Sequence, residues 1–227
     1  LTRPFARRCS IFGTGAWARS SRCAIVSEAA VAPSQQGIVM SLVLLPLAEG
    51  FEEIEAVSVI DLLRRAGVTV VTASLGPRPV TGSHGITIEA DCALDEVLDR
   101  DFDMIVLPGG LPGAEHLKRD ERVISLLRKF DEKGRYIAAI CAAPGVLAHA
   151  GLLDGRTATS FPGFLDPVAT AGVTLSEDPV VSDGSVVTSR GAGTAMDFAL
   201  TLVEILEGRS TREEVESRLQ RPGPAHA

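Results

Sequence analysis

The chain has 227 residues, of which 45% are hydrophobic and 22% charged, a composition that suits one ordinary globular domain with or without an appendage. Its formal net charge of −7 excludes a general nucleic-acid binder, because contacts with phosphates need a basic face. No segment reaches the run of about 18 apolar residues that crosses a membrane, so we expect a soluble protein.

Residues 1–40 differ in charge from the rest of the chain. They hold five arginines, no lysine and a single acid, Glu28, so this segment carries +4 and the remainder −11. A basic segment rich in Arg, Ser and Ala is typical of an organellar transit peptide, and a disordered basic tail is the alternative. The first interpretation predicts a chloroplast or mitochondrial protein, and the second a cytoplasmic one. We expect residues 220–227 to form a disordered C-terminal tail.

Cysteine and histidine are too few and too scattered for a disulfide framework or a metal site. Two of the four cysteines lie in the tail, which leaves Cys92 and Cys141 in the body of the chain. The chain has no Cys-x-x-Cys motif, no Cys/His cluster and no GxGxxG fingerprint. We therefore predict a reducing compartment, no metal and no cofactor.

From residue 41 onward, strand and helix patterns alternate. Continuous apolar runs predict buried strands, and helical spacing of apolar residues predicts the segments between them. This alternation predicts an α/β fold with a doubly wound, mostly parallel sheet and helices on both faces. The predicted strands are 41–47, 68–75, 85–91, 102–110, 135–141, 156–161 and 185–191, and the predicted helices are 50–67, 120–134, 143–151 and 194–208.

Three short motifs stand at the carboxyl ends of predicted strands, where doubly wound folds place their sites. They are Leu-Pro-Gly-Gly at 107–110, Cys141 after Ile-Ala-Ala-Ile, and Ser-Arg-Gly-Ala-Gly at 189–193. A cysteine at a sharp strand-to-helix turn faces the free N–H groups and positive dipole end of the next helix, which lower the pKa of a thiol. The sequence therefore predicts a thiolate at Cys141, and a buried structural cysteine is the alternative.

Four motifs together resemble one known family. They are GFEEIE at 50–55, LPGG at 107–110, AAICAAP at 138–144 and TSRGAGTAMDFAL at 188–200. Over residues 41–219 the chain is similar to the DJ-1/PfpI superfamily, and specifically to its DJ-1 branch. The resemblance implies a flavodoxin-like sandwich, a homodimer and an oxidation-sensitive cysteine. Members have been assigned glutathione-independent glyoxalase (glyoxalase III), deglycase, chaperone and oxidative-stress roles.

The resemblance also implies roles for individual residues. Cys141 matches the nucleophile of the family and Glu55 its partner carboxyl. A carboxyl buried beside an anionic sulfur has a raised pKa, so it stays protonated and donates a hydrogen bond. Gly109 and Gly110 match the oxyanion and substrate-binding loop, in which the backbone N–H of Gly110 is joined by that of Ala142.

Two positions depart from family patterns. Many members have a histidine before a proline where this chain has Phe161, and phenylalanine transfers no protons. The PfpI branch has histidine directly after its cysteine, where this chain has Ala142, so we expect no Cys-His-Glu hydrolase triad. We expect His149 to be packed or half-exposed rather than a base. Arg190 and Arg65 are candidates for anion binding or a dimer interface.

These residues lead to two hypotheses. The first is a glyoxalase III, in which Cys141 attacks a small 2-oxoaldehyde such as methylglyoxal and Glu55 moves a proton between adjacent carbons, without glutathione, metal or another cofactor. The second is a redox-sensing protective protein or chaperone, in which Cys141 is oxidised to a sulfinate and catalysis is small or absent. Both assign the chemistry to the same thiol.

Overall fold

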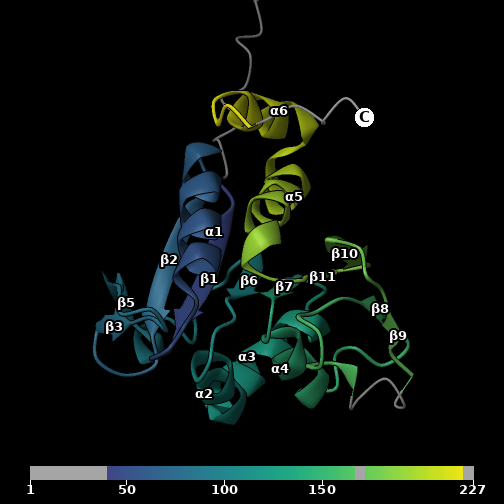
Figure 1. Cartoon of the computed structure of the whole chain (residues 1–227). Coiled ribbons are helices and arrows are strands. Elements are labelled where there is room, and N and C mark those ends of the chain that lie inside the picture. Colours follow the sequence, from purple (N-terminus) through teal and green to yellow (C-terminus); the bar gives the residue numbers. More distant parts are fainter. Residues whose placement is uncertain (1–39, 167–171, 222–227) are drawn as a thin grey trace, which may run out of the picture. The chain divides into compact units, whose positions relative to one another are not determined.

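A seven-stranded sheet forms the centre of the protein. The computed structural model describes residues 40–166 and 172–221, and Figure 1 shows how the helices lie against this sheet. The strand order is β10-β11-β7-β6-β1-β2-β5. The strands are β1 (Leu42–Leu47), β2 (Thr69–Ser74), β5 (Cys92–Ala93), β6 (Met104–Leu107), β7 (Tyr136–Ile140), β10 (Val180–Asp183) and β11 (Val186–Ser189).

Neighbouring strands of this sheet run parallel, except that β10 and β11 pair antiparallel. The predicted doubly wound, mostly parallel sheet is thus confirmed. Because parallel strands end at the same edge of a sheet, the residues that follow β1, β6, β7 and β11 gather along one edge.

Both faces of the sheet are buried. Along β1, Val43 faces one hydrophobic core and Leu44 faces the other, and both side chains are 0% exposed. Met104 and Ile105 of β6 divide between the same two cores. This arrangement explains why the strands appear in the sequence as continuous apolar runs instead of alternating patterns.

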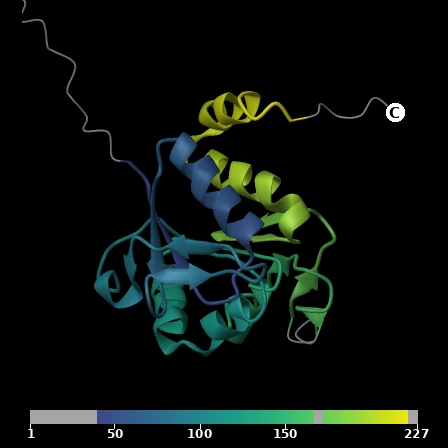
Figure 2. The same cartoon turned by 60° about the vertical axis from the view of Figure 1, so that its left-hand side comes forward.

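Helices cover the two faces. Figures 1 and 2 show α1 and α5 on one side of the sheet and α2, α3 and α4 on the other, in agreement with the two hydrophobic cores. The helix α6 follows α5 directly and packs against it. The helices are α1 (Glu53–Arg65), α2 (Gly113–Arg119), α3 (Glu121–Glu132), α4 (Pro144–His149), α5 (Ala195–Glu207) and α6 (Arg209–Ser217), with short 3-10 turns η1 (Leu94–Glu96) and η3 (Ala192–Thr194).

The helix predicted at 50–67 begins three residues later, at Glu53. Glu52 caps it, because its side chain accepts a 2.7 Å hydrogen bond from the backbone N–H of Glu55. Gly50 has a φ of 81°, a left-handed conformation outside a helix. The cap places Glu55 in the first helical turn, directly beyond the end of β1.

Several short elements were not predicted from the sequence. The helix α2 has seven residues and buries only two apolar side chains, Ala114 and Leu117, which is too little for a periodic pattern. The helix α6 is polar and buries Val215 alone among its own residues. The hairpin strand predicted at 85–91 is present as β4 (Thr87–Glu89), and its partner β3 (Pro79–Thr81), which was not predicted, pairs with it outside the central sheet. The segment predicted at 156–161 is reduced to β8 (Thr157–Ala158), which pairs with β9 (Thr174–Leu175).

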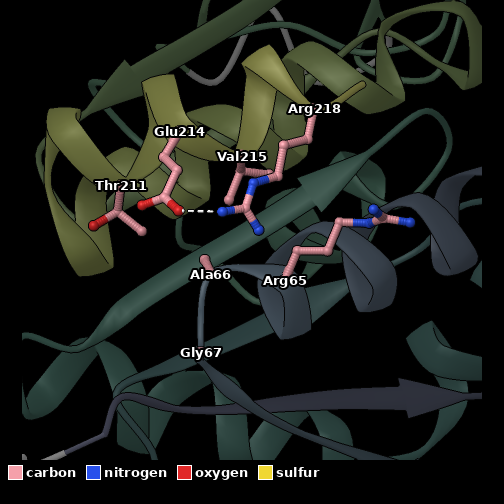
Figure 3. Close-up of a pocket in the computed structure, with 7 residues that line it drawn as sticks. All are labelled: Arg65, Ala66, Gly67, Thr211, Glu214, Val215 and Arg218. Carbon is pink, nitrogen blue, oxygen red and sulfur yellow. Dashed lines mark hydrogen bonds and ion pairs between the residues drawn. The ribbon is translucent and has the colours of Figure 1, made fainter. Parts of the chain in front are cut away.

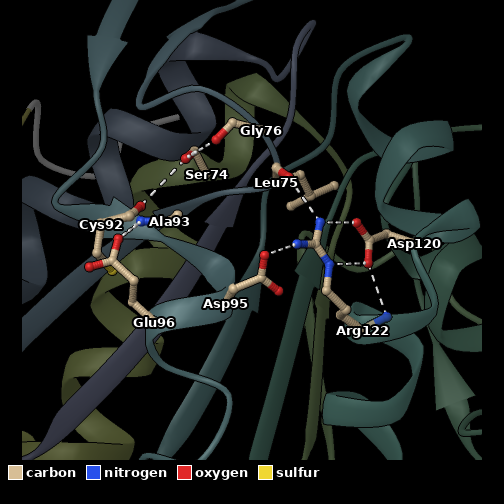
Figure 4. A network of polar contacts seen from close by, with 9 residues as sticks. All are labelled: Ser74, Leu75, Gly76, Cys92, Ala93, Asp95, Glu96, Asp120 and Arg122. Atoms are coloured by element: carbon tan, nitrogen blue, oxygen red, sulfur yellow. Dashed lines mark hydrogen bonds and ion pairs between the residues drawn. The ribbon is translucent and has the colours of Figure 1, made fainter.

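An arginine joins three separate segments on the α3 side of the sheet. Arg122 donates to Asp120 at 2.6 Å, to Asp95 of η1 at 2.9 Å and to the carbonyl of Leu75 at 2.8 Å (Figure 4). Its side chain is only 31% exposed, so these charge-assisted bonds are partly shielded from water. Arg122 thus ties the start of α3 to η1 and to the turn after β2.

The predicted transit peptide and C-terminal tail lie mostly outside the described residues, since 1–39 and 222–227 are not among them. Within the described part of the chain, no helix is long and apolar enough to cross a membrane.

Candidate functional site

Cys141 occupies a sharp turn between β7 and α4. Its φ is 65°, a left-handed conformation that costs a non-glycine residue about 1 kcal/mol or more. Two backbone hydrogen bonds of 2.9 Å hold it there, one from its own N–H to the carbonyl of Ser189 and one from the N–H of Phe161 to its carbonyl. The predicted elbow is therefore present, at the edge where the parallel strands end.

Glu55 lies next to this cysteine and is 0% exposed. Its Oε2 accepts a 2.8 Å hydrogen bond from the backbone N–H of Gly109. Its other oxygen, Oε1, has no hydrogen-bond partner of standard geometry among the described residues. The carboxyl is still close enough to Cys141 for each side chain to change the pKa of the other.

The Gly109–Gly110 loop fits closely between these side chains. A Cβ built on Gly109 would lie 2.7 Å from both the Cβ of Cys141 and Oε2 of Glu55, closer than real Cβ contacts allow. Gly110 has a φ of 88°, and a Cβ there would lie 2.4 Å from the backbone nitrogen of Glu52. Glycine is therefore required at both positions for the loop to touch the cysteine and α1 together.

The surroundings of the sulfur change one prediction. Burial, together with the neighbouring Glu55 carboxyl, raises the pKa of the Cys141 thiol to about 12, although N–H groups of Gly110 and Ala142 point at the sulfur and act in the opposite direction. The lowered pKa predicted from the helix N-terminus is therefore wrong for the free protein. The physical reason is that desolvation and a nearby carboxylate outweigh two backbone donors.

Glu55 also has a shifted pKa. Burial raises it to about 7, while hydrogen bonds from Gly109 and Cys141 partly oppose that rise. At neutral pH the thiol therefore keeps its proton. The raised pKa of Glu55 makes its carboxylate a stronger base than an exposed glutamate, so it can accept a proton from the neighbouring thiol during a reaction.

The structure thus brings together five residues singled out in the sequence, namely Cys141, Glu55, Gly109, Gly110 and Ala142. It does not bring His149 to the sulfur. That residue is exposed at the end of α4 and lines a groove of about 320 Å³ with Lys118 and Phe164.

The two arginines proposed for anion binding or an interface lie in different places. Arg65 is in the last turn of α1, paired with Asp61 at 2.6 Å, and borders a cavity of about 380 Å³ between α1 and α6 (Figure 3). Arg190 donates to the backbone carbonyl of Glu177 at 2.9 Å and makes no carboxylate ion pair within the described residues. Within one chain, neither arginine is therefore part of the Cys141–Glu55 contact.

One group in the described part of the chain has the donor set of a metal site. Ligand atoms of Glu52, Glu53 and His84 lie within 4.8 Å of one another. Burial alone would raise the pKa of Glu53, but hydrogen bonds from His84 and Ile86 hold its pKa at about 2. Both carboxylate oxygens of Glu53 form hydrogen bonds with the β3–β4 hairpin, so the cluster connects α1 to that hairpin.

The motif at 189–193, singled out in the sequence, does meet the cysteine: the carbonyl of Ser189 accepts the N–H of Cys141, and a Cβ built on Gly191 would lie 4.0 Å from its Sγ. Sequence reasoning missed Phe164, which packs against Phe161. The Phe-Pro-Gly-Phe segment at 161–164 was the available signal, because two aromatics three residues apart in a tight turn can contact each other.

A strained cysteine and a buried glutamate at the carboxyl edge of a doubly wound sheet define a class of α/β proteins with a cysteine at a strand-to-helix elbow. A sequence model of the DJ-1/PfpI family matches residues 41–205. The chain therefore belongs to the DJ-1/PfpI family, and the resemblance seen in its motifs is confirmed.

Individual relatives agree with this assignment. Protein DJ-1 homolog A of Arabidopsis thaliana is 45% identical over 185 residues, which are 80% of this chain and 47% of that protein. A deglycase of Pyrococcus abyssi is 36% identical over 165 residues, which are 73% of this chain and 99% of that protein. The crystal structure of Drosophila melanogaster DJ-1beta has a TM-score of 0.77 at 40% identity and covers 81% of this chain and 100% of its own. The chain spans less than half the length of the Arabidopsis DJ-1 homologs A and B.

Proposed function

We propose that this protein is a glutathione-independent glyoxalase, which converts methylglyoxal-type 2-oxoaldehydes to 2-hydroxy acids. The observation that carries the proposal is the contact between the Cys141 thiol and the buried Glu55 carboxyl, with two N–H groups aimed at the sulfur. This arrangement supplies a nucleophile, a base and an oxyanion site in one place.

The first step forms a bond between the sulfur and the aldehyde carbon. The Cys141 thiol attacks while Glu55 accepts its proton. The raised pKa of Glu55 makes its carboxylate a stronger base than an ordinary glutamate, and formation of the C–S bond drives the transfer. The aldehyde oxygen becomes an oxyanion beside the N–H groups of Gly110 and Ala142. The pH dependence of activity is therefore set by the pKa of Glu55 and not by that of the Cys141 thiol.

The second stage moves hydrogen within the substrate. Glu55 first passes the thiol proton to the oxyanion, which gives a hydroxyl group and restores the carboxylate. It then removes the proton from the former aldehyde carbon and delivers it to the neighbouring carbon through an enediol, so the substrate is oxidised at one carbon and reduced at the next. The resulting thioester is hydrolysed by water to lactate, which restores the thiol. Because the redox change is internal to the substrate, no external electron carrier is needed.

The test is lactate production from methylglyoxal by the wild type, Cys141→Ala and Glu55→Gln. We expect turnover in the wild type and loss to background in both variants. Full turnover by Cys141→Ala, or no lactate from the folded wild type, would refute the proposed function. Circular dichroism of each variant separates loss of chemistry from loss of fold.

A second function uses the same sulfur as a redox sensor or as part of a protective chaperone. The observation in its favour is Phe161, whose side chain cannot take part in proton transfer. The resemblance to the family implies a histidine at this position in many members. Oxidation by peroxide would give a sulfinate, which the Gly110 and Ala142 N–H groups and a protonated Glu55 could hold. Mass spectrometry after peroxide treatment, beside methylglyoxal kinetics, decides between the two. A stable Cys141 sulfinate with background turnover supports the sensor.

We also propose a homodimer formed through α1 and the β3–β4 hairpin. Ile54 and Val57 of α1 are 58% and 47% exposed, and Ile86 in the hairpin is 57% exposed. A paired apolar surface of this kind is typical of an interface. Ile54→Glu combined with Val57→Glu should convert the dimer to a monomer in analytical ultracentrifugation, whereas Leu175→Glu, at another exposed apolar residue, should not.

Residues 1–40 are proposed to direct the protein to an organelle. The support is their charge, with five arginines and one acid. A fluorescent protein fused to residues 1–40 should enter chloroplasts or mitochondria, and a diffuse cytoplasmic signal would contradict this proposal.

A further inference from the structure

One side of the Cys141 sulfur is bordered by an aromatic ring. A Cβ built on Gly191 would lie 3.6 Å from Cδ2 of Phe161 and 4.0 Å from Sγ of Cys141. Since glycine has no side chain, the ring and the sulfur border the same space over Gly191. The Phe161 side chain is 50% exposed, so half of its apolar surface is in water.

The ring is also held in place. The backbone N–H of Phe161 donates to the carbonyl of Cys141 at 2.9 Å, which fixes its position relative to the elbow. Phe164 packs edge-to-face against it, with ring centroids 6.2 Å apart and planes at 74°. The N–H of Phe164 closes this turn by donating to the carbonyl of Phe161 at 3.2 Å.

The aromatic pair continues into a neighbouring groove. Phe164 and Ala142 both line the groove of about 320 Å³ between α2 and α4. Its walls include several residues with small or absent side chains, namely Ala114, Gly145 and Gly163. The far walls also carry the polar side chains of Glu115, Lys118 and His149. The apolar surface offered to a substituent larger than methyl is therefore that of the Phe161–Phe164 pair.

We propose that Phe161 is a specificity-determining residue that selects 2-oxoaldehydes carrying an aromatic group on the ketone carbon. This inference rests on the proposed function, because it assumes the same reaction. Recognition of the aromatic group can be measured separately from turnover. An aromatic substituent would cover the exposed face of Phe161 and remove apolar surface of both rings from water. Methylglyoxal offers one methyl group and gains little from this contact.

The test that does not depend on turnover is the alkylation of Cys141 in the full chain. N-phenylmaleimide and N-ethylmaleimide are compared by mass spectrometry of the Cys141 peptide, and their rate ratio is divided by the ratio for free glutathione. An aromatic contact is worth roughly twofold to tenfold in rate. We therefore expect a normalised ratio of about 2 to 10 in the wild type.

Variants assign this preference to the ring. Phe161→Ala should bring the normalised ratio to about 1, since no aromatic contact remains. Phe161→Leu preserves an apolar side chain for folding, and its normalised ratio should lie between those of the wild type and Phe161→Ala. Leu175→Ala removes an exposed apolar residue from β9 and should keep the wild-type ratio. A wild-type ratio that is unchanged in Phe161→Ala and Phe161→Leu overturns the proposal.

Turnover then separates the two proposals. Phenylglyoxal conversion to mandelate is compared with methylglyoxal conversion to lactate, as kcat/KM at initial rates. If the alkylation preference is present but neither substrate is converted, the glyoxalase function fails and the aromatic recognition by Phe161 stands. If both are converted and their kcat/KM ratio is the same in Phe161→Ala, the specificity proposal fails and the glyoxalase function stands.

Discussion

Replacing Glu55 by glutamine tests the buried carboxyl most directly. Burial raises the pKa of Glu55 from 4.5 to about 7. A raised pKa means that folding favours the protonated form, so the stability from this group is present in full below pH 4.5. It is lost as the pH rises through 7, because the folded protein must then ionise a desolvated carboxyl.

The magnitude follows from the two pKa values. A difference between 4.5 and about 7 corresponds to about 3 kcal/mol of unfolding free energy, at roughly 1.4 kcal/mol for each pH unit. Glu55→Gln stays neutral at every pH. Its stability relative to the wild type should therefore increase by about 3 kcal/mol between pH 4.5 and pH 8.

The assay is urea denaturation of both proteins at several pH values. Glu121→Gln is the matched control, because Glu121 also stands in the first turn of a helix but is exposed. This control should track the wild type at every pH. Parallel pH curves for the wild type and Glu55→Gln would refute a raised pKa at Glu55.

In kinetics, wild-type kcat/KM should rise with pH through about 7, as expected for a base with that pKa.

Three further predictions concern other residues. Gly109→Ala should lower turnover by about a hundredfold or more, because its Cβ would displace Cys141 and Glu55. Gly76→Ala should fold and react normally, since its Cβ would meet nothing within 4 Å. Arg122→Met should reduce the unfolding free energy by about 1–2 kcal/mol, while Arg209→Met, in an exposed ion pair, should change it by less than about 0.5 kcal/mol. If Gly109→Ala or Arg122→Met behaved like its control variant, the contacts described for that residue would be contradicted. Glu53, with a pKa of about 2, contributes stability above pH 4.5 that is lost as the pH falls toward 2. His84→Ala should shrink this acid-dependent loss in denaturation curves.

The sheet was predictable because its signal is local and strong. A strand buried on both faces must be apolar at every position, and β1, β6 and β7 carry such runs. The short elements were not predictable in this way. For example, α2 and β9 are held by contacts with distant segments and bury too few apolar residues to show a period.

The sequence by itself placed Glu55, Gly110 and Cys141 after buried parallel strands, which end at one edge of a sheet. The resemblance of its motifs to the DJ-1/PfpI family then singled out Cys141 and Glu55 as partners. Only the tertiary structure decided the protonation of the pair. The pKa of a thiol depends on how much water reaches it and on the charge beside it, and both come from segments far apart in the chain. The resemblance to the family had already singled out Phe161, but only the structure shows that its ring borders the space beside the sulfur and packs against Phe164.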